Sequence, residues 1–71
     1  PNPSRDYISV ESKNSRITSL ELFNLEGRRI MYVPSSDTKL DLALTELTSG
    51  PYIVKVLMEN ADTEVFTIIK E

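Results

Sequence analysis

The chain has 71 residues, room for one small domain, and its 39% hydrophobic and 27% charged residues are typical of a folded globular protein. A net charge of −3 excludes electrostatic attraction to nucleic acid or anionic lipid as its basis of function. The sequence has no cysteine, histidine or tryptophan, which excludes disulfides, Cys-rich zinc sites and Ser–His or Cys–His catalytic pairs. We expect a single domain over residues 1–71.

The first residues have the composition of a linker. Pro1, Asn2 and Pro3 favour an extended or turning backbone, so residues 1–5 are predicted to lead into the domain. The chain lacks a secretory leader and starts at a proline, which we interpret as a piece of a longer polypeptide. Residues 7–11 then alternate and predict a strand whose Ile8 and Val10 share one face.

The next two segments predict a hairpin. Residues 17–25 have a period of two, with Leu20 and Leu22 on one face and Glu21 on the other. Residues 28–33 continue in extended form after a turn that ends at Gly27, a residue suited to positive φ. These two strands are expected to pair.

Residues 39–44 allow two interpretations. Their leucines alternate with polar residues as in a strand, but leucine and alanine also favour a helix, and Leu40, Leu44 and Leu47 have helical spacing. We favour a strand, followed by a turn over residues 45–51 that places Leu47 in the core.

Two strands complete the pattern. Residues 52–59 alternate most clearly, and residues 64–70 follow a turn at 60–63. Val65, Phe66, Ile68 and Ile69 put apolar groups on both faces of the last strand, which predicts burial on two sides or an exposed edge. Short strands separated by turn residues predict an all-β fold, a small antiparallel sandwich or barrel.

No group of residues supports catalysis. Ser12 and Lys13 are adjacent and would face opposite ways on a strand. The acidic residues are scattered, and residues 59–64 lack the glycine and the terminal glutamate of a specific calcium loop. Arg28 and Arg29 form no basic patch alone. We expect no enzyme activity and no cofactor, and neither nucleic acid nor a small-molecule substrate as a ligand. Stacking of Tyr7, Tyr32 and Tyr52 on sugars is a weaker alternative to packing.

Several motifs occur together in a characteristic order. They are the opening Pro1-Asn2-Pro3, residues 20–30 with LELFNLEGRRI, residues 40–42 with LDL, residues 47–56 with LTSGPYIVKV, and the closing residues 66–70 with FTIIK. In this order the whole chain resembles the type A C-terminal sorting domain of the type IX (Por) secretion system.

The resemblance implies a fold and a function. The family adopts a small immunoglobulin-like β-sandwich of about six to seven strands and acts as a secretion address on exported proteins. It implies passage of the parent protein through the periplasm and recognition by the outer-membrane translocation machinery. A sortase-like cysteine peptidase then removes the domain and joins many parent proteins to lipopolysaccharide. The parent protein, which is itself an enzyme in some cases, is thus expected at the outer-membrane surface or outside the cell.

The resemblance also assigns roles to residues. Pro1, Asn2, Pro3, Gly27, Gly50 and Tyr52 match the family's motif turns. The predicted recognition residues lie on the last strand and are Val65, Phe66, Thr67, Ile68, Ile69 and Lys70. Pro51 departs from the family pattern and is expected to shorten strand pairing by removing one donor.

Two further expectations concern partners. An apolar last strand predicts self-association through pairing with a neighbouring copy. The alternative function is a glycan- or protein-binding sandwich on a surface protein.

Overall fold

A computed structural model describes the backbone of residues 3–4 and 6–71. This part of the chain consists of strands and turns and has no apolar helix long enough to cross a membrane. The strands are β1 (Pro3–Ser4), β2 (Tyr7–Glu11), β3 (Ile17–Phe23), β4 (Arg29–Pro34), β5 (Lys39–Ala43), β6 (Gly50–Met58) and β7 (Thr63–Lys70).

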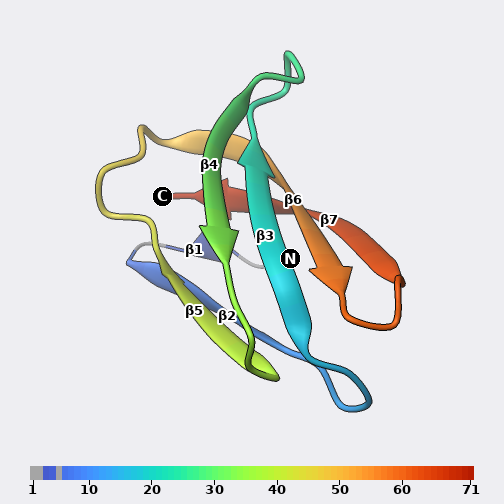
Figure 1. Ribbon diagram of the computed structural model, residues 1–71. Coiled ribbons are helices and arrows are strands. Elements are labelled where there is room, and N and C mark those ends of the chain that lie inside the picture. Colours follow the sequence, from blue (N-terminus) through green and yellow to red (C-terminus); the bar gives the residue numbers. More distant parts are fainter. Residues whose placement is uncertain (1–2, 5) are drawn as a thin grey trace.

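The strands form two sheets that face each other (Figure 1). The larger sheet has the order β1-β7-β6-β3-β4, and β2 pairs with β5 in the smaller one. All pairs are antiparallel except β1 with β7, where Pro3 lies opposite Ile69 in a parallel ladder. The all-β prediction is therefore confirmed as a small sandwich. In immunoglobulin strand names, β7, β6, β3 and β4 would be G, F, C and C′, and β2 and β5 would be B and E. The topology is therefore consistent with an immunoglobulin-like arrangement.

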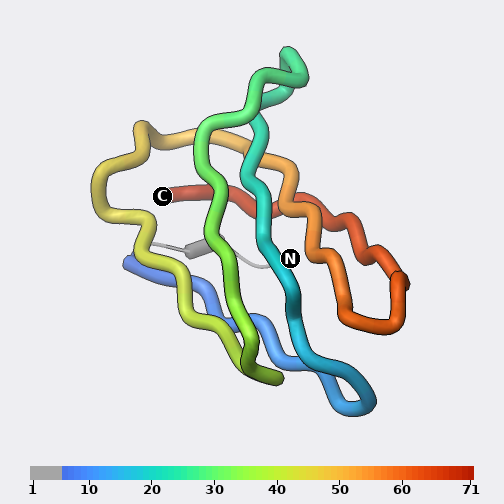
Figure 2. The backbone as a smooth tube through the Cα atoms, in the orientation of Figure 1, coloured from blue at the N-terminus to red at the C-terminus, as the bar shows by residue number. Residues whose placement is uncertain are grey.

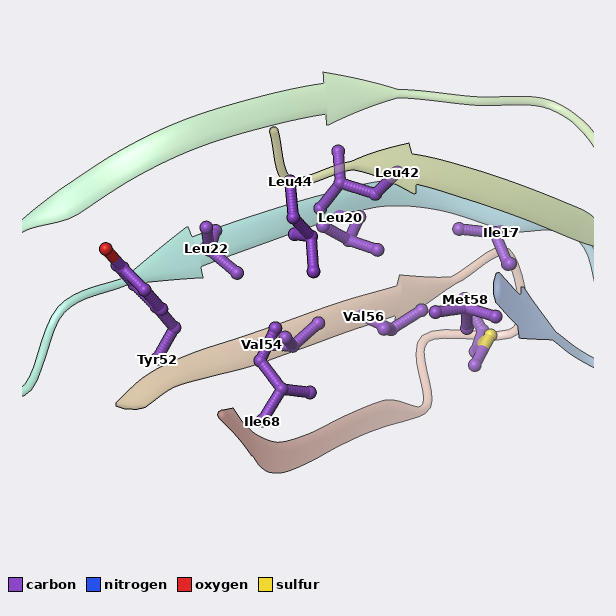
Figure 3. Packing of buried hydrophobic residues seen from close by; sticks show 11 residues of the cluster. Ile17, Leu20, Leu22, Leu42, Leu44, Tyr52, Val54, Val56, Met58 and Ile68 are labelled. Atoms are coloured by element: carbon purple, nitrogen blue, oxygen red, sulfur yellow. The ribbon is translucent and has the colours of Figure 1, made fainter. Parts of the chain in front are cut away.

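The core lies between the two sheets. Alternate residues of β3, β6 and β7 point toward β2 and β5, as the period of two requires. Figure 3 shows Tyr52 at one end of this core and Ile17 and Met58 at the other. Its buried hydrophobic members are Val10, Ile17, Leu20, Leu22, Leu42, Leu44, Tyr52, Val54, Val56, Met58 and Ile68.

The strand interpretation of residues 39–44 is confirmed, and the helical alternative is wrong. Leu42 is buried and Leu40 is half-buried against the core, while Lys39 and Asp41 are exposed. Pairing of β5 with β2 over its whole length satisfies the backbone groups of Leu40 and Leu42, which face β2, while those of Lys39 and Asp41 face outward. Leu47 packs against the core from the loop after β5, as expected.

Pro51 does not shorten the pairing of β6 with β7, but the pairing of β6 with β3 stops at Ile53, two residues from Pro51. Strand β6 begins at Gly50, and Pro51 lies opposite Ile69 in the register with β7. The Met58 amide donates to the Asp62 carbonyl at 2.8 Å, so in this ladder the even-numbered residues of β6 exchange hydrogen bonds with β7. The nitrogen of Pro51 faces the β3 side, at the next bonding position after the Phe23–Ile53 pair, so the end of that ladder agrees with the loss of one donor.

The predicted hairpin of β3 and β4 is confirmed, and Asn24 organises its turn. The Asn24 side-chain oxygen accepts hydrogen bonds from the amides of Glu26 at 2.9 Å and Arg28 at 3.0 Å. Gly27 has a φ of 86°, in the left-handed region that favours glycine. A register shift between Leu22 and Phe23 marks a bulge beside this turn.

Candidate recognition surface on strand β7

The two faces of β7 have different environments. Ile68 is 2% exposed and Phe66 is half-buried against the core, so both point into the sandwich. Val65 and Ile69 are 63% and 48% exposed and point outward with Thr67 between them. The predicted recognition residues are thus divided between a face that holds the strand in place and a face that is open to a partner.

The backbone of β7 also has two sides. Because Met58 bonds Asp62 across the turn, the even-numbered residues of β7 direct their backbone groups toward β6. The amide and carbonyl groups of Thr63, Val65 and Thr67 therefore face away from β6. In the described part of the chain, β1 pairs with β7 only at Ile69 and Lys70. Residues 1–2, which precede β1, lie outside the described residues, so we limit the term to positions further from β1 and call the outward backbone of Thr63 and Val65 the free edge of β7.

The outer face of the larger sheet is apolar near the Ile69 end of β7, whereas the cross-strand neighbour of Val65 is the exposed Lys55. Cross-strand neighbours place Thr67 beside Ile53, and Ile53 beside Phe23 on β3. Ile69 lies beside the exposed ring of Pro51. Strands β2 and β5 cover the opposite face of this sheet, as the tube in Figure 2 shows, so the face carrying Val65 and Ile69 has no second layer in the described chain.

The far end of the outer face is charged. Arg29 donates to a carboxylate oxygen of Glu21 at 3.0 Å, and its guanidinium lies 5.2 Å from the ring centre of Tyr32. The Arg29 side chain is 54% exposed, so this ion pair and cation–π contact contribute modestly to stability. Lys55 on β6 lies between Glu21 and Val65, so the apolar part of the outer face is limited to the Ile69 end of β7.

The loop between β5 and β6 holds the end of β7. The Ser49 hydroxyl donates to the Glu71 carbonyl at 3.1 Å, and Gly50 pairs with Lys70. Gly50 has a φ of 141°, and no neighbouring atom lies within 4 Å of where its Cβ would be. The Tyr52 hydroxyl closes the same loop by donating to the Thr48 carbonyl at 2.8 Å. Gly50 and Tyr52 thus lie at the junction that positions the last strand.

The other candidate residues are not brought together into a metal site or a stacking surface in the described part of the chain. Asn60 and Asp62 bond each other within the β6–β7 turn, at 3.0 Å from the Asp62 amide to the Asn60 side-chain oxygen. Among the residues that the structure describes, no three acidic groups are placed to hold a metal ion. Tyr7 lies outside the smaller sheet and Tyr32 outside the larger one, whereas Tyr52 is buried. The tyrosines therefore do not form one stacking platform.

Two of the predicted motif residues lie outside the described part of the chain, Pro1 and Asn2. Pro3 lies in β1, beside Ile69. Sequence reasoning did not separate the outward residues of β7 from the inward ones, nor did it identify the free edge. The signal that would have done so is the short turn at residues 59–61, because its length sets which residues of β7 bond to β6.

Comparisons with known proteins agree with this arrangement. A family model described as a secretion system C-terminal sorting domain matches residues 1–71. Domains of that family are sorting signals for type IX secretion, non-catalytic in general, and imply interaction with the secretion machinery and export to the cell surface or the extracellular space. No curated protein and no solved structure matches the chain significantly. The match over the whole chain shows that it belongs to the family of type IX secretion system C-terminal sorting domains.

Proposed function

We propose that β7 is the part of this sorting domain that the outer-membrane machinery of type IX secretion recognises. The supporting observation is that one strand combines exposed apolar side chains with an open backbone edge. Exposed apolar groups beside an unpaired edge are features that proteins normally avoid unless a partner uses them. The proposed recognition residues are Val65, Phe66, Thr67, Ile68, Ile69 and Lys70.

The residues of β7 have different tasks in this proposal. Phe66 and Ile68 pack in the core and fix the position of the strand. Val65, Thr67 and Ile69 make the contacts, because their side chains point outward. Lys70 is half-buried opposite Gly50 and anchors the end of the strand to the β5–β6 loop.

The family membership supports a wider sequence of events. The parent protein crosses the periplasm and is exported with this domain attached. A sortase-like cysteine peptidase then cuts in the linker before β1 and leaves the parent protein at the surface or in the medium. Such a cut leaves the sandwich intact, since the first described pairing of the domain is at Pro3 and Ser4.

An export assay tests the recognition role. The domain is fused behind a periplasm-directed reporter in a cell with type IX secretion, and the reporter is measured in the medium and at the surface. We expect export of the intact fusion and retention when residues 66–71 are deleted. We also expect the pair Val65→Thr and Ile69→Thr to reduce export at least tenfold.

The matched control lies at the opposite edge of the same sheet. Ile30 and Tyr32 on β4 are exposed to similar extents, so Ile30→Thr with Tyr32→Thr removes comparable apolar surface. This control should export normally. Normal export of the β7 pair, or equal loss with both pairs, would contradict recognition through β7.

The same strand provides a route to self-association. A second copy that pairs with the free edge of β7 would form a dimer with one continuous sheet. Light scattering of the purified domain over a range of concentrations tests this, and a mass that stays monomeric at high concentration contradicts it. Fusions with Val65→Thr and Ile69→Thr should dissociate at higher concentration than the parent domain.

A further inference from the structure

The sandwich protects its other sheet edges and leaves β7 unprotected. On β4, the Ser35 amide donates to the Thr18 carbonyl at 3.0 Å, which in this register directs the backbone of Tyr32 and Pro34 outward. Pro34 has no amide to offer, and the bulge at the other end of the strand disrupts its regular edge. Proline and bulges are both known means of preventing edge pairing.

The smaller sheet carries charge at three of its outward positions, and the others, Tyr7, Ser9 and Ala43, are uncharged. The Ser12 amide donates to the Thr38 carbonyl at 2.7 Å, so Glu11 on β2 and Lys39 and Asp41 on β5 have backbone groups that face outward. The Ser9 hydroxyl also donates to the Asp41 carboxylate across the sheet. Charged residues at these positions oppose the addition of a strand.

The free edge of β7 has neither kind of protection. From Thr63 to Ile69 the strand contains no proline, and its pairing with β6 has no register shift. Thr63, Val65 and Thr67, whose backbone groups face outward, are uncharged and favour strands. Glu64 is the one charged residue in this stretch, and its backbone faces β6.

The surroundings of the edge favour a basic partner. Glu64 lines an open hollow of about 610 Å³ together with Glu11, Asp62 and a single basic residue, Lys13. On the other face, Val65 and Ile69 are exposed beside the edge, and Lys55 lies on the side of Val65 away from the edge. A strand placed here would have alternate side chains next to an apolar surface and next to an acidic one.

We propose that the translocation machinery binds this domain by strand addition, contributing an extended segment that hydrogen-bonds to the free edge of β7. The segment carries apolar side chains beside Val65 and Ile69 and a lysine or arginine beside Glu64. This inference rests on the proposed function of β7 and specifies its partner. Main-chain hydrogen bonds supply affinity in this mode, and the alternating side chains supply specificity.

Hydrogen exchange of individual amides tests the mode directly. In the purified domain, the amides of Thr63 and Val65 should exchange rapidly, and those of Phe66 and Ile68 slowly because they bond to β6. Adding outer-membrane vesicles from a type IX-competent strain should slow exchange at Thr63 and Val65 at least tenfold. Vesicles from a strain without the translocon serve as the control.

Two substitutions, each with a control, add a functional measurement. Thr63→Pro removes one outward amide at the start of β7 and no bond to β6, and should reduce export at least tenfold. Tyr7→Pro removes one outward amide at the start of β2 and should export normally. Glu64→Lys should reduce export severalfold, whereas Glu59→Lys, in the turn and outside that hollow, should not.

The outcomes separate this inference from the proposed function. If Val65→Thr with Ile69→Thr blocks export but the Thr63 and Val65 amides stay unprotected with vesicles, β7 is read by its side chains and strand addition is wrong. Protection that rises with domain concentration, with no further slowing when vesicles are added to the dilute monomer, assigns the edge to a second copy alone and also overturns the inference. Export after deletion of residues 66–71 overturns the proposed function itself.

Discussion

The hydroxyl of Tyr52 donates a hydrogen bond to the backbone carbonyl of Thr48 at 2.8 Å. Tyr52 lies near the start of β6 and is 7% exposed, and Thr48 lies in the loop that carries the chain from the smaller sheet to the larger one. This is the geometry of a tyrosine corner, in which a tyrosine at the start of a strand fixes the preceding loop. Since Ser49 of the same loop bonds Glu71, the contact also helps to place the end of β7.

We expect loss of the Tyr52 hydroxyl to lower the stability of the domain, and loss of the Tyr32 hydroxyl to leave it nearly unchanged. Tyr52→Phe leaves the Thr48 carbonyl without this donor and should lower the free energy of unfolding by about 1 kcal/mol. For a domain of this size the melting temperature should fall by about 4–8 °C. Tyr32→Phe removes an exposed hydroxyl and should change the melting temperature little. Equal melting temperatures for Tyr52→Phe and the parent domain would show that the bond does not stabilise the loop.

Adjacent isoleucines on β7 should respond in opposite ways. Ile68→Ala opens a cavity in the core and should cost about 2–5 kcal/mol of unfolding free energy in urea denaturation. Ile69→Ala trims an outward side chain and should cost less than about 0.5 kcal/mol. If Ile68→Ala is too unstable to measure, Ile68→Val should cost about 0.5–1.5 kcal/mol. A larger loss at Ile69 than at Ile68 would contradict the register of β7.

The β6–β7 turn contains a strained residue. Ala61 has a φ of 75°, the left-handed conformation that the last residue of a three-residue hairpin loop adopts. A side chain disfavours this conformation by about 1–2 kcal/mol, so Ala61→Gly should stabilise the domain by about 0.5 kcal/mol or more, measured by urea denaturation. Ala43→Gly, in the exposed part of β5, should instead destabilise it by about 0.5–1 kcal/mol. Destabilisation by Ala61→Gly would refute strain at this position.

Gly27 should tolerate asparagine better than alanine. Its Cβ position is open, with no atom within 4 Å, so the cost of a substitution comes from the positive φ and not from a clash. Gly27→Ala should destabilise the domain by about 1 kcal/mol, and Gly27→Asn by less, because asparagine visits this conformation more readily. Thermal melts of both variants measure the difference. Equal losses would indicate that the turn does not depend on φ at Gly27.

Local patterns were sufficient to predict most of the strands. The alternation of Leu20, Leu22, Val54 and Val56 indicated which residues are buried, since only one face of each strand meets the other sheet. Residues 39–44 were harder, because leucine and alanine suit a helix as well, and pairing with β2 decided the matter. The effect of Pro51 depended on which neighbour its nitrogen faces: the pairing of β6 with β7 is intact, and the pairing of β6 with β3 ends at Ile53.

The sequence by itself determined the fold class, the turn at Gly27, the strand at residues 64–70 and, through its ordered motifs, the family. These follow from contacts between residues close in the chain, or from patterns that do not need the register between strands. Only the tertiary structure decided that Val65 and Ile69 face outward, that Ile68 faces inward and that the edge of β7 is open beyond β1. The physical reason is that the side chains of a strand alternate faces, so its exposed side and its free backbone groups are set by pairing with residues distant in sequence.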